Sequence, residues 1–167
     1  YRSTYEIISF ARRIAPTVKI DAIERHGEMP RIVECPNVEA QMRTIQNRIK
    51  GFAKSPYSSL GIIAKTNELA KMLYDQLSRE QHVHFISPES TRFESGISVT
   101  SIQMAKGLEF DEVIVPFADQ STYHSQYDSS LLYIACTRAM HRLTLFHSGP
   151  LSPLLQKNED QAPVATV

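Results

Sequence analysis

Residues 99–115 constrain the fold of this chain more than any other stretch. They form an apolar run that begins at Val99, a polar turn at Lys106-Gly107, and a second apolar run at Val113-Ile114-Val115. Short apolar runs separated by a turn are typical of strands buried in the sheet of an α/β protein. Such sheets place ligand contacts at the ends of their strands, so this turn is the first candidate for a functional site.

The remaining sequence alternates between strand and helix patterns. Helices are predicted after the capping residues Ser3 or Thr4, after Asn37, and after Thr66 or Asn67. An apolar helical run follows at 131–140, and strands are predicted at 31–35, 60–64, 82–86 and 142–146. Strand, helix and strand joined by short connections form the βαβ unit of a parallel sheet. The sequence therefore predicts one α/β domain over residues 1–148, followed by a weakly ordered tail at 149–167.

Composition excludes several classes of function. The chain has 18 basic and 18 acidic residues, so any contact with nucleic acid must be local. Cys35 and Cys136 are far apart, and the histidines show no metal-binding spacing, so no metal site is predicted. No apolar run approaches the roughly 20 residues of a membrane span. These features favour a cytoplasmic protein that has no contact with a membrane.

Three short segments carry the functional signal. They are Tyr1-Arg2-Ser3-Thr4, Lys106-Gly107-Leu108-Glu109-Phe110, and the segment from Tyr133 to Ala139. Taken singly, the first could be only a helix cap, and the arginine of the third could be a solvated surface residue. In this order, however, they resemble motifs IV, V and VI of superfamily 1 helicases of the UvrD/Rep type. The resemblance extends from Tyr1 to about Phe146.

The resemblance implies a RecA-like (P-loop NTPase-like) parallel sheet flanked by helices, which is the C-terminal lobe of a two-lobed ATP motor. It implies that Arg138 is the arginine finger and that Arg2 also reaches the γ-phosphate. Arginine suits this role because its planar guanidinium makes bidentate hydrogen bonds to phosphate. By the same resemblance Tyr1 stacks on adenine and Glu109 contacts the ribose. Gly107 suits a tight turn beside a ligand because it tolerates positive φ.

The resemblance also implies contacts with single-stranded DNA, from Ser101, Gln103 and Asn67. Many relatives have threonine and histidine where this chain has Ser101 and Gln103. Both side chains still form hydrogen bonds with phosphate or sugar, and such contacts position a strand without reading its sequence.

The chain lacks the dipeptide Gly-Lys, and therefore has no GxxxxGK[ST] phosphate loop. It also begins at Tyr1 without a methionine, so we expect a fragment of a longer protein. ATP and its Mg²⁺ would then be held mainly by an N-terminal RecA-like lobe, which is the expected partner of this one. The fragment alone should be catalytically inactive.

Three hypotheses remain open. The first is an ATP-dependent DNA helicase or translocase. The second is a factor that uses ATP to remodel or recycle RNA polymerase, because fewer than a hundred residues separate Thr4 from Val99. That compact spacing leaves no room for the extra subdomain of UvrD-type relatives and is most similar to the HelD-type branch. The third is an α/β interaction module without hydrolysis, against which the presence of Arg2, Glu109 and Arg138 argues.

Overall fold

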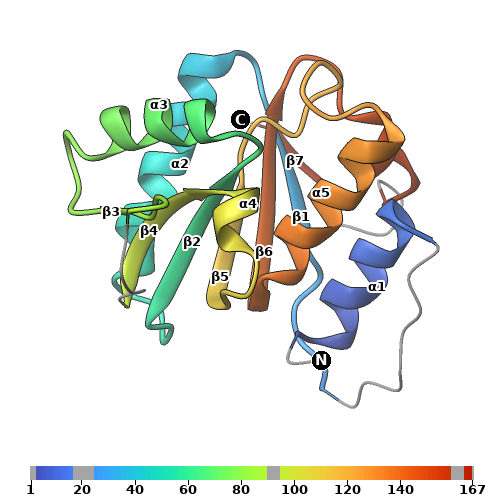
Figure 1. Cartoon of the computed structure of the whole chain (residues 1–167), viewed down its shortest axis with the longest axis horizontal. Helices are drawn as coiled ribbons and strands as arrows, with labels where there is room; N and C mark the ends of the chain where they lie inside the picture. The colour runs from blue at the N-terminus through green and yellow to red at the C-terminus, as the bar shows by residue number, and fades with distance from the viewer. Residues whose placement is uncertain (1–2, 17–24, 90–94, 159–163, 167) are drawn as a thin grey trace.

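The computed structural model describes residues 3–16, 25–89, 95–158 and 164–166. Its described strands form one seven-stranded sheet in the order β3-β4-β2-β5-β6-β1-β7, and every pair is parallel (Figure 1). The strands are β1 (Arg31–Cys35), β2 (Ser59–Ala64), β3 (His84–Phe85), β4 (Gly96–Ser101), β5 (Phe110–Val115), β6 (Ala139–Ser148) and β7 (Val164–Thr166).

Helices cover both faces of the sheet. One face carries α1 (Tyr5–Ile14), α4 (Ile102–Ala105), α5 (Gln126–Thr137) and the 3₁₀ helix η1 (Pro153–Asn158), while the other carries α2 (Val38–Phe52) and α3 (Asn67–Leu77). Their starts follow from local chemistry, because the side chains of Thr4, Asn37 and Thr66 each accept a hydrogen bond from a backbone amide in the first turn.

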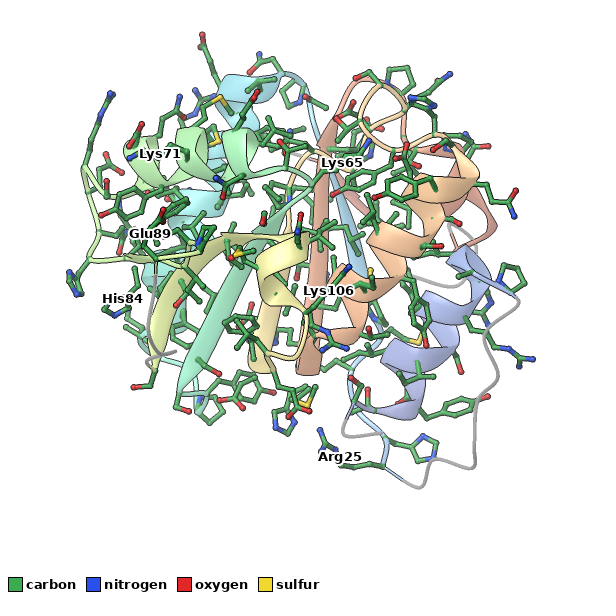
Figure 2. All side chains as sticks on the ribbon, in the orientation of Figure 1. Arg25, Lys65, Lys71, His84, Glu89 and Lys106 are labelled. Carbon is green, nitrogen blue, oxygen red and sulfur yellow. The ribbon has the colours of Figure 1, made fainter. Side chains whose placement is uncertain are left out.

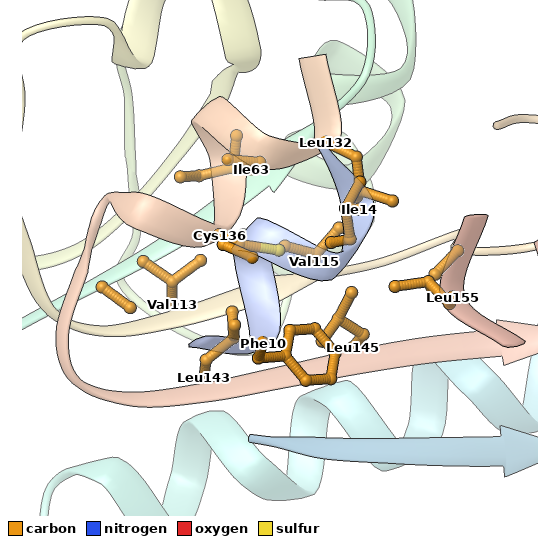
Figure 3. Close-up of a cluster of buried hydrophobic side chains, with 14 of the residues drawn as sticks. Phe10, Ile14, Ile63, Val113, Val115, Leu132, Cys136, Leu143, Leu145 and Leu155 are labelled. Atoms are coloured by element: carbon orange, nitrogen blue, oxygen red, sulfur yellow. The ribbon is translucent and has the colours of Figure 1, made fainter. Parts of the chain in front are cut away.

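The core consists of two layers separated by the sheet. Strand residues alternate between them: Val113 and Val115 pack against α1 and α5, whereas Ile114 faces α2 and α3. Figure 3 shows the first layer, in which Phe10 and Ile14 of α1 lie beside Cys136 and Leu132 of α5 and above strands β5 and β6. Central strand β2 is buried along its whole length, as its apolar sequence requires.

The predicted fold class, a parallel sheet flanked by helices, is confirmed. The helix predicted at 131–140 spans Gln126–Thr137, and the strand predicted at 82–86 is limited to His84–Phe85. Three further details differ. The turn after Val99 contains the short helix α4, and β6 begins at Ala139, three residues earlier than predicted. The third concerns residues 149–158, which were predicted to be weakly ordered. They pack against the domain because Leu151 and Leu155 are buried against it.

The parallel sheet places the connections between its strands on two opposite sides of the molecule. The carboxyl ends of β2 and β4 lie at one edge and the amino ends of β5 and β6 at the other. In Figure 2 Lys65, which follows β2, lies in the upper half of the view, whereas Lys106, which precedes β5, lies lower, in front of the sheet. The residues predicted to be functional divide between these two edges. None of the described helices is long and apolar enough to cross a membrane.

Candidate functional site

The backbone around Arg138 joins the first and third functional segments. We call Ser3, Leu108, Thr137, Arg138 and Ala139 the arginine junction. The Ser3 hydroxyl lies 2.6 Å from the carbonyl oxygen of Ala139 and 3.2 Å from that of Thr137. A hydroxyl carries one proton, so it donates to these two acceptors in turn or shares its proton between them. Ser3 thus holds the chain on both sides of Arg138, although it lies more than 130 residues away in the sequence.

The second functional segment joins the same junction. The Nη1 of Arg138 donates to the Leu108 carbonyl at 3.2 Å, and the Phe110 amide donates to the Arg138 carbonyl at 2.9 Å. The peptide of Glu109 is therefore held between two hydrogen bonds to one arginine. Segments that the sequence places far apart meet within a single network.

The Arg138 side chain is half-buried and lies against neutral acceptors. Its Nε donates to the Ile134 carbonyl at 3.2 Å, at the end of α5. Burial lowers the pKa of the Arg138 guanidinium, and the nearby Glu109 carboxylate opposes that shift. An arginine keeps its charge under such conditions. Hydrogen bonds to carbonyls are weaker than bonds to an anion, so an arriving phosphate can replace them.

The turn before Glu109 has the geometry that its sequence predicts. Gly107 has φ of +83°, in the region that favours glycine, and both Lys106 and Glu109 are exposed. In Figure 2 Lys106 extends from the end of α4. The charged groups of this turn therefore lie on the surface next to the arginine junction.

The Ser3 bonds lead to a prediction about stability. Ser3→Ala would leave the two buried carbonyls without this donor, which typically costs about 1–3 kcal/mol. We expect the midpoint of thermal unfolding to fall by several degrees, since about 2–4 °C accompanies each kcal/mol in a domain of this size. Differential scanning calorimetry measures the change. Ser121→Ala, which removes an exposed hydroxyl bonded to Asp119, is the control and should leave the midpoint within about 1 °C. An unchanged midpoint in Ser3→Ala would show that the junction does not depend on this hydroxyl.

A groove at the carboxyl edge brings together the residues that were predicted to contact nucleic acid. It has a volume of about 420 Å³ and lies between the ends of β2 and β4 and the start of α5. We call it the carboxyl-edge groove, and its lining is Lys65, Thr66, Asn67, Pro88, Ser101, Gln103, Met104, Tyr127 and Leu131. Asn67, Ser101 and Gln103 come from two separate connections, and the parallel sheet places both at one edge.

The polar groups of the groove differ in their availability. The Ser101 oxygen accepts a hydrogen bond from the Met104 amide and so caps α4, and Thr66 caps α3 in the same way. Their hydroxyl protons remain available as donors. Asn67 and Gln103 are exposed, and each amide offers both a donor and an acceptor.

Lys65 joins the groove to α5. Its ammonium lies 2.8 Å from Asp128 and donates to the Thr122 carbonyl at 2.7 Å. Asp128 also accepts hydrogen bonds from the backbone amides of His124 and Ser125. Burial alone would raise the pKa of Asp128, but these three donors outweigh it and hold the pKa well below its usual range. The charge of Lys65 is thereby largely neutralised within the protein.

This pair predicts a dependence of stability on pH. The pKa of Asp128 is lower in the folded than in the unfolded chain. Its ionised carboxylate therefore stabilises the fold above the unfolded pKa of about 4, and this stabilisation is lost as the pH falls below that value. Asp128→Asn should therefore be less stable than wild type at pH 7, with the difference shrinking below about pH 4. Urea unfolding at pH 7, 5, 4 and 3 measures both curves. Asp75→Asn, in an exposed pair with Lys71, should match wild type at pH 7 within about 0.5 kcal/mol. A difference for Asp128→Asn that is independent of pH would contradict the assignment.

The predicted residues thus form two groups rather than one. Arg138 belongs to the arginine junction, with Gly107 and Glu109 in the turn beside it, and Asn67, Ser101 and Gln103 lie in the carboxyl-edge groove. Tyr1 and Arg2 lie outside the described residues. Among the described residues, no group of three or more His, Cys, Asp or Glu side chains is placed to hold a metal ion.

Sequence reasoning missed three features of these sites. The link from Ser3 to the backbone around Arg138 has no local signal, because it joins the two ends of the chain. The Lys65–Asp128 pair likewise depends on the fold. Tyr127 lines the groove but was not singled out from the sequence.

Comparison with protein families matches residues 96–146 to the UvrD-like helicase C-terminal domain. The matched stretch runs from β4 through β6 and contains Ser101, Gln103, Glu109 and Arg138. No curated protein matches the sequence significantly.

Solved structures give a closer comparison. The C-terminal domain of a possible DNA helicase from Lactobacillus plantarum is 35% identical, has a TM-score of 0.82, and the alignment covers 98% of each chain. The helicase nonstructural protein 10 of an arterivirus has a TM-score of 0.56 at 14% identity, and its complex with DNA has 0.55 at 14%. These two alignments cover 96% of this chain but only 36% and 37% of the viral chains, and they support the fold alone.

Proposed function

Because this chain belongs to the family of UvrD-like helicase C-terminal domains, we propose that it is the second motor lobe of an ATP-dependent DNA helicase or translocase. In this proposal Arg138 supplies positive charge to the transferred phosphate, and the carboxyl-edge groove holds single-stranded DNA. The observation that carries it is the convergence of two distant segments on Arg138, the first through Ser3 and the second through Leu108 and Phe110.

The arginine junction suits phosphoryl transfer. That reaction depends mainly on fixed positive charge beside the γ-phosphate and on positioning of the reacting groups. The Arg138 guanidinium donates hydrogen bonds to two backbone carbonyls and to the Thr137 hydroxyl, all of which are neutral. Its positive charge is therefore available to an anion. Glu109 lies exposed beside it and provides an acceptor for ribose hydroxyls. In the proposal Tyr1 and Arg2, which directly precede Ser3, add the adenine contact and a second guanidinium.

ATP and Mg²⁺ require more than this chain offers. This chain presents the guanidinium donor of Arg138 and the carboxylate acceptor of Glu109 on one surface, which fits one side of a nucleotide site. A phosphate loop and a magnesium-binding acidic group would come from an N-terminal RecA-like lobe of the same protein. When bound between the lobes, ATP supplies the phosphoryl group and the energy of its transfer. This chain's own contribution is to place Arg138 and Glu109 at the interface.

The carboxyl-edge groove suits a single strand. It offers exposed amides and capping hydroxyls without a dense positive charge, which fits contacts that position a strand without reading its sequence. The neutral net charge of the chain fits a contact confined to one groove.

The function is tested on the full-length protein. We expect ATP hydrolysis that single-stranded DNA stimulates, and strand displacement on a partial duplex. Absence of both activities, with the protein folded and ATP bound, would reject the proposal.

The second candidate is remodelling of RNA polymerase by the same motor. The observation that favours it is that every described helix and strand from α1 to β4 belongs to the single α/β domain. The described residues between α1 and β4 therefore contain no inserted subdomain. A pull-down of RNA polymerase beside the strand-displacement assay separates the candidates. Binding of polymerase with ATP hydrolysis but without unwinding would favour this second function.

A further inference from the structure

Tyr127 is an aromatic side chain that the fold does not use. It lies in the first turn of α5 and is 73% exposed, although tyrosine normally buries much of its ring. The same turn is stabilised by the capping box of Ser125 and Asp128, so the helix needs no contribution from Tyr127. An exposed aromatic ring beside a groove is a candidate for binding.

The carboxyl-edge groove has one polar and one apolar side. Asn67, Ser101 and Gln103 contribute the polar groups, while Met104, Tyr127 and Leu131 contribute apolar surface. A single-stranded nucleic acid has the same division, with a polar sugar-phosphate backbone and bases with apolar faces. Such a strand would lay its backbone along the polar side and its bases against the apolar side.

The charge of the groove limits how it can bind. Lys65 is the basic residue in the lining of the groove. The Lys65 ammonium nitrogen lies 2.8 Å from a carboxylate oxygen of Asp128. Binding by phosphate neutralisation alone is therefore weak here. A strand held in this groove needs a contribution that does not depend on charge, and stacking of a base on an aromatic ring provides one.

We propose that Tyr127 is a base-stacking residue that holds single-stranded DNA in the carboxyl-edge groove. The inference rests on the proposed function and adds to it a residue and a mode of contact. Stacking is indifferent to sequence because every base has an aromatic face, which suits a motor that moves along any strand.

Binding of a fluorescent 12-nucleotide oligo(dT) to the 167-residue chain, followed by anisotropy, tests the inference. Tyr127→Ser should weaken binding by roughly 5- to 100-fold, whereas Tyr127→Phe should stay close to wild type because the ring is kept. An oligonucleotide of abasic sites should bind wild type and Tyr127→Ser equally. Tyr5→Ser, which alters another exposed helical tyrosine at 47% exposure, is the control. Irradiation of an oligonucleotide containing 5-iododeoxyuridine should crosslink to the peptide that contains Tyr127.

The outcomes separate the inference from the function on which it rests. If wild type binds oligo(dT) and Tyr127→Ser binds equally well, the stacking role is rejected while the groove remains a binding site. If Tyr127→Ser weakens the abasic oligonucleotide to the same extent, the contact is not stacking and the inference is overturned. If wild type binds no single strand and instead retains a protein partner such as RNA polymerase through Tyr127, both the inference and the DNA-binding proposal fail.

Discussion

Replacing Arg138 by alanine in the full-length protein should lower the ATP turnover number about 10³- to 10⁵-fold, the range found for arginine fingers. Among the described residues of the arginine junction, Arg138 alone carries a positive charge. Hydrogen bonds to its side chain and to its backbone carbonyl hold it in place. Steady-state hydrolysis with saturating single-stranded DNA measures the effect. Arg43→Ala, which removes an exposed arginine of α2, is the matched control and should turn over ATP at the wild-type rate.

Two further measurements separate catalysis from folding. Arg138→Lys keeps the charge but loses the planar guanidinium, so its turnover should remain well below wild type. Binding of oligo(dT) should change little in either variant, because the junction and the carboxyl-edge groove lie at opposite edges of the sheet. Near wild-type turnover in folded Arg138→Ala would remove Arg138 from the mechanism.

Gly61→Ala should be the most destabilising single-methyl change in the sheet, by about 1–3 kcal/mol. Gly61 lies in the middle of β2, and a Cβ added there would approach ring atoms of Phe110 to 2.7–2.8 Å. Phe110 is 1% exposed and belongs to the segment that leads from Gly107 into β5. The methyl therefore has to displace either β2 or β5, the strand that follows the Gly107 turn. Urea unfolding at pH 7 measures the loss.

A second substitution tests the cause. Phe110→Leu replaces the ring by a smaller side chain, so the double variant with Gly61→Ala should lose less stability than the sum of the two single variants. Gly51→Ala provides a control of opposite sign, because nothing lies within 4 Å of the added Cβ in α2. It should stabilise the chain by about 0.5–1 kcal/mol. Additive losses for Gly61 and Phe110 would show that the two residues do not compete for the same space.

Local chemistry accounts for what the sequence could predict. Thr4, Asn37 and Thr66 cap helices as their residue types suggest, and the apolar run at 60–64 is a buried central strand. The positive φ of Gly107 also follows from its residue type. Each of these features depends on neighbours a few residues away in the chain.

Features that depend on distant contacts were not predictable. Leu151 and Leu155 lie in a Pro- and Ser-containing segment that indicated a weakly ordered tail, yet they are buried because α1 and the sheet offer them an apolar surface. The division of the candidate residues between a junction and a groove likewise follows from the parallel direction of the strands, because residues that follow a strand and residues that precede one lie at opposite ends. Ser101 and Gly107 are six residues apart, and helix α4 between them leads from one edge of the site to the other.

The strand order also determines when this chain can fold on the ribosome. Strand β1 pairs with β6 and β7, whose residues are synthesised more than 100 residues later, and α1 packs on α5 and η1. At about 5–20 residues per second, β1 waits roughly 5–20 s for its first partner. During that interval the apolar faces of α1 and β1 are without their native cover. We expect α1 to dock and β1 to join the sheet only after β2, β4 and β5 have paired, and β7 to follow because it pairs with β1.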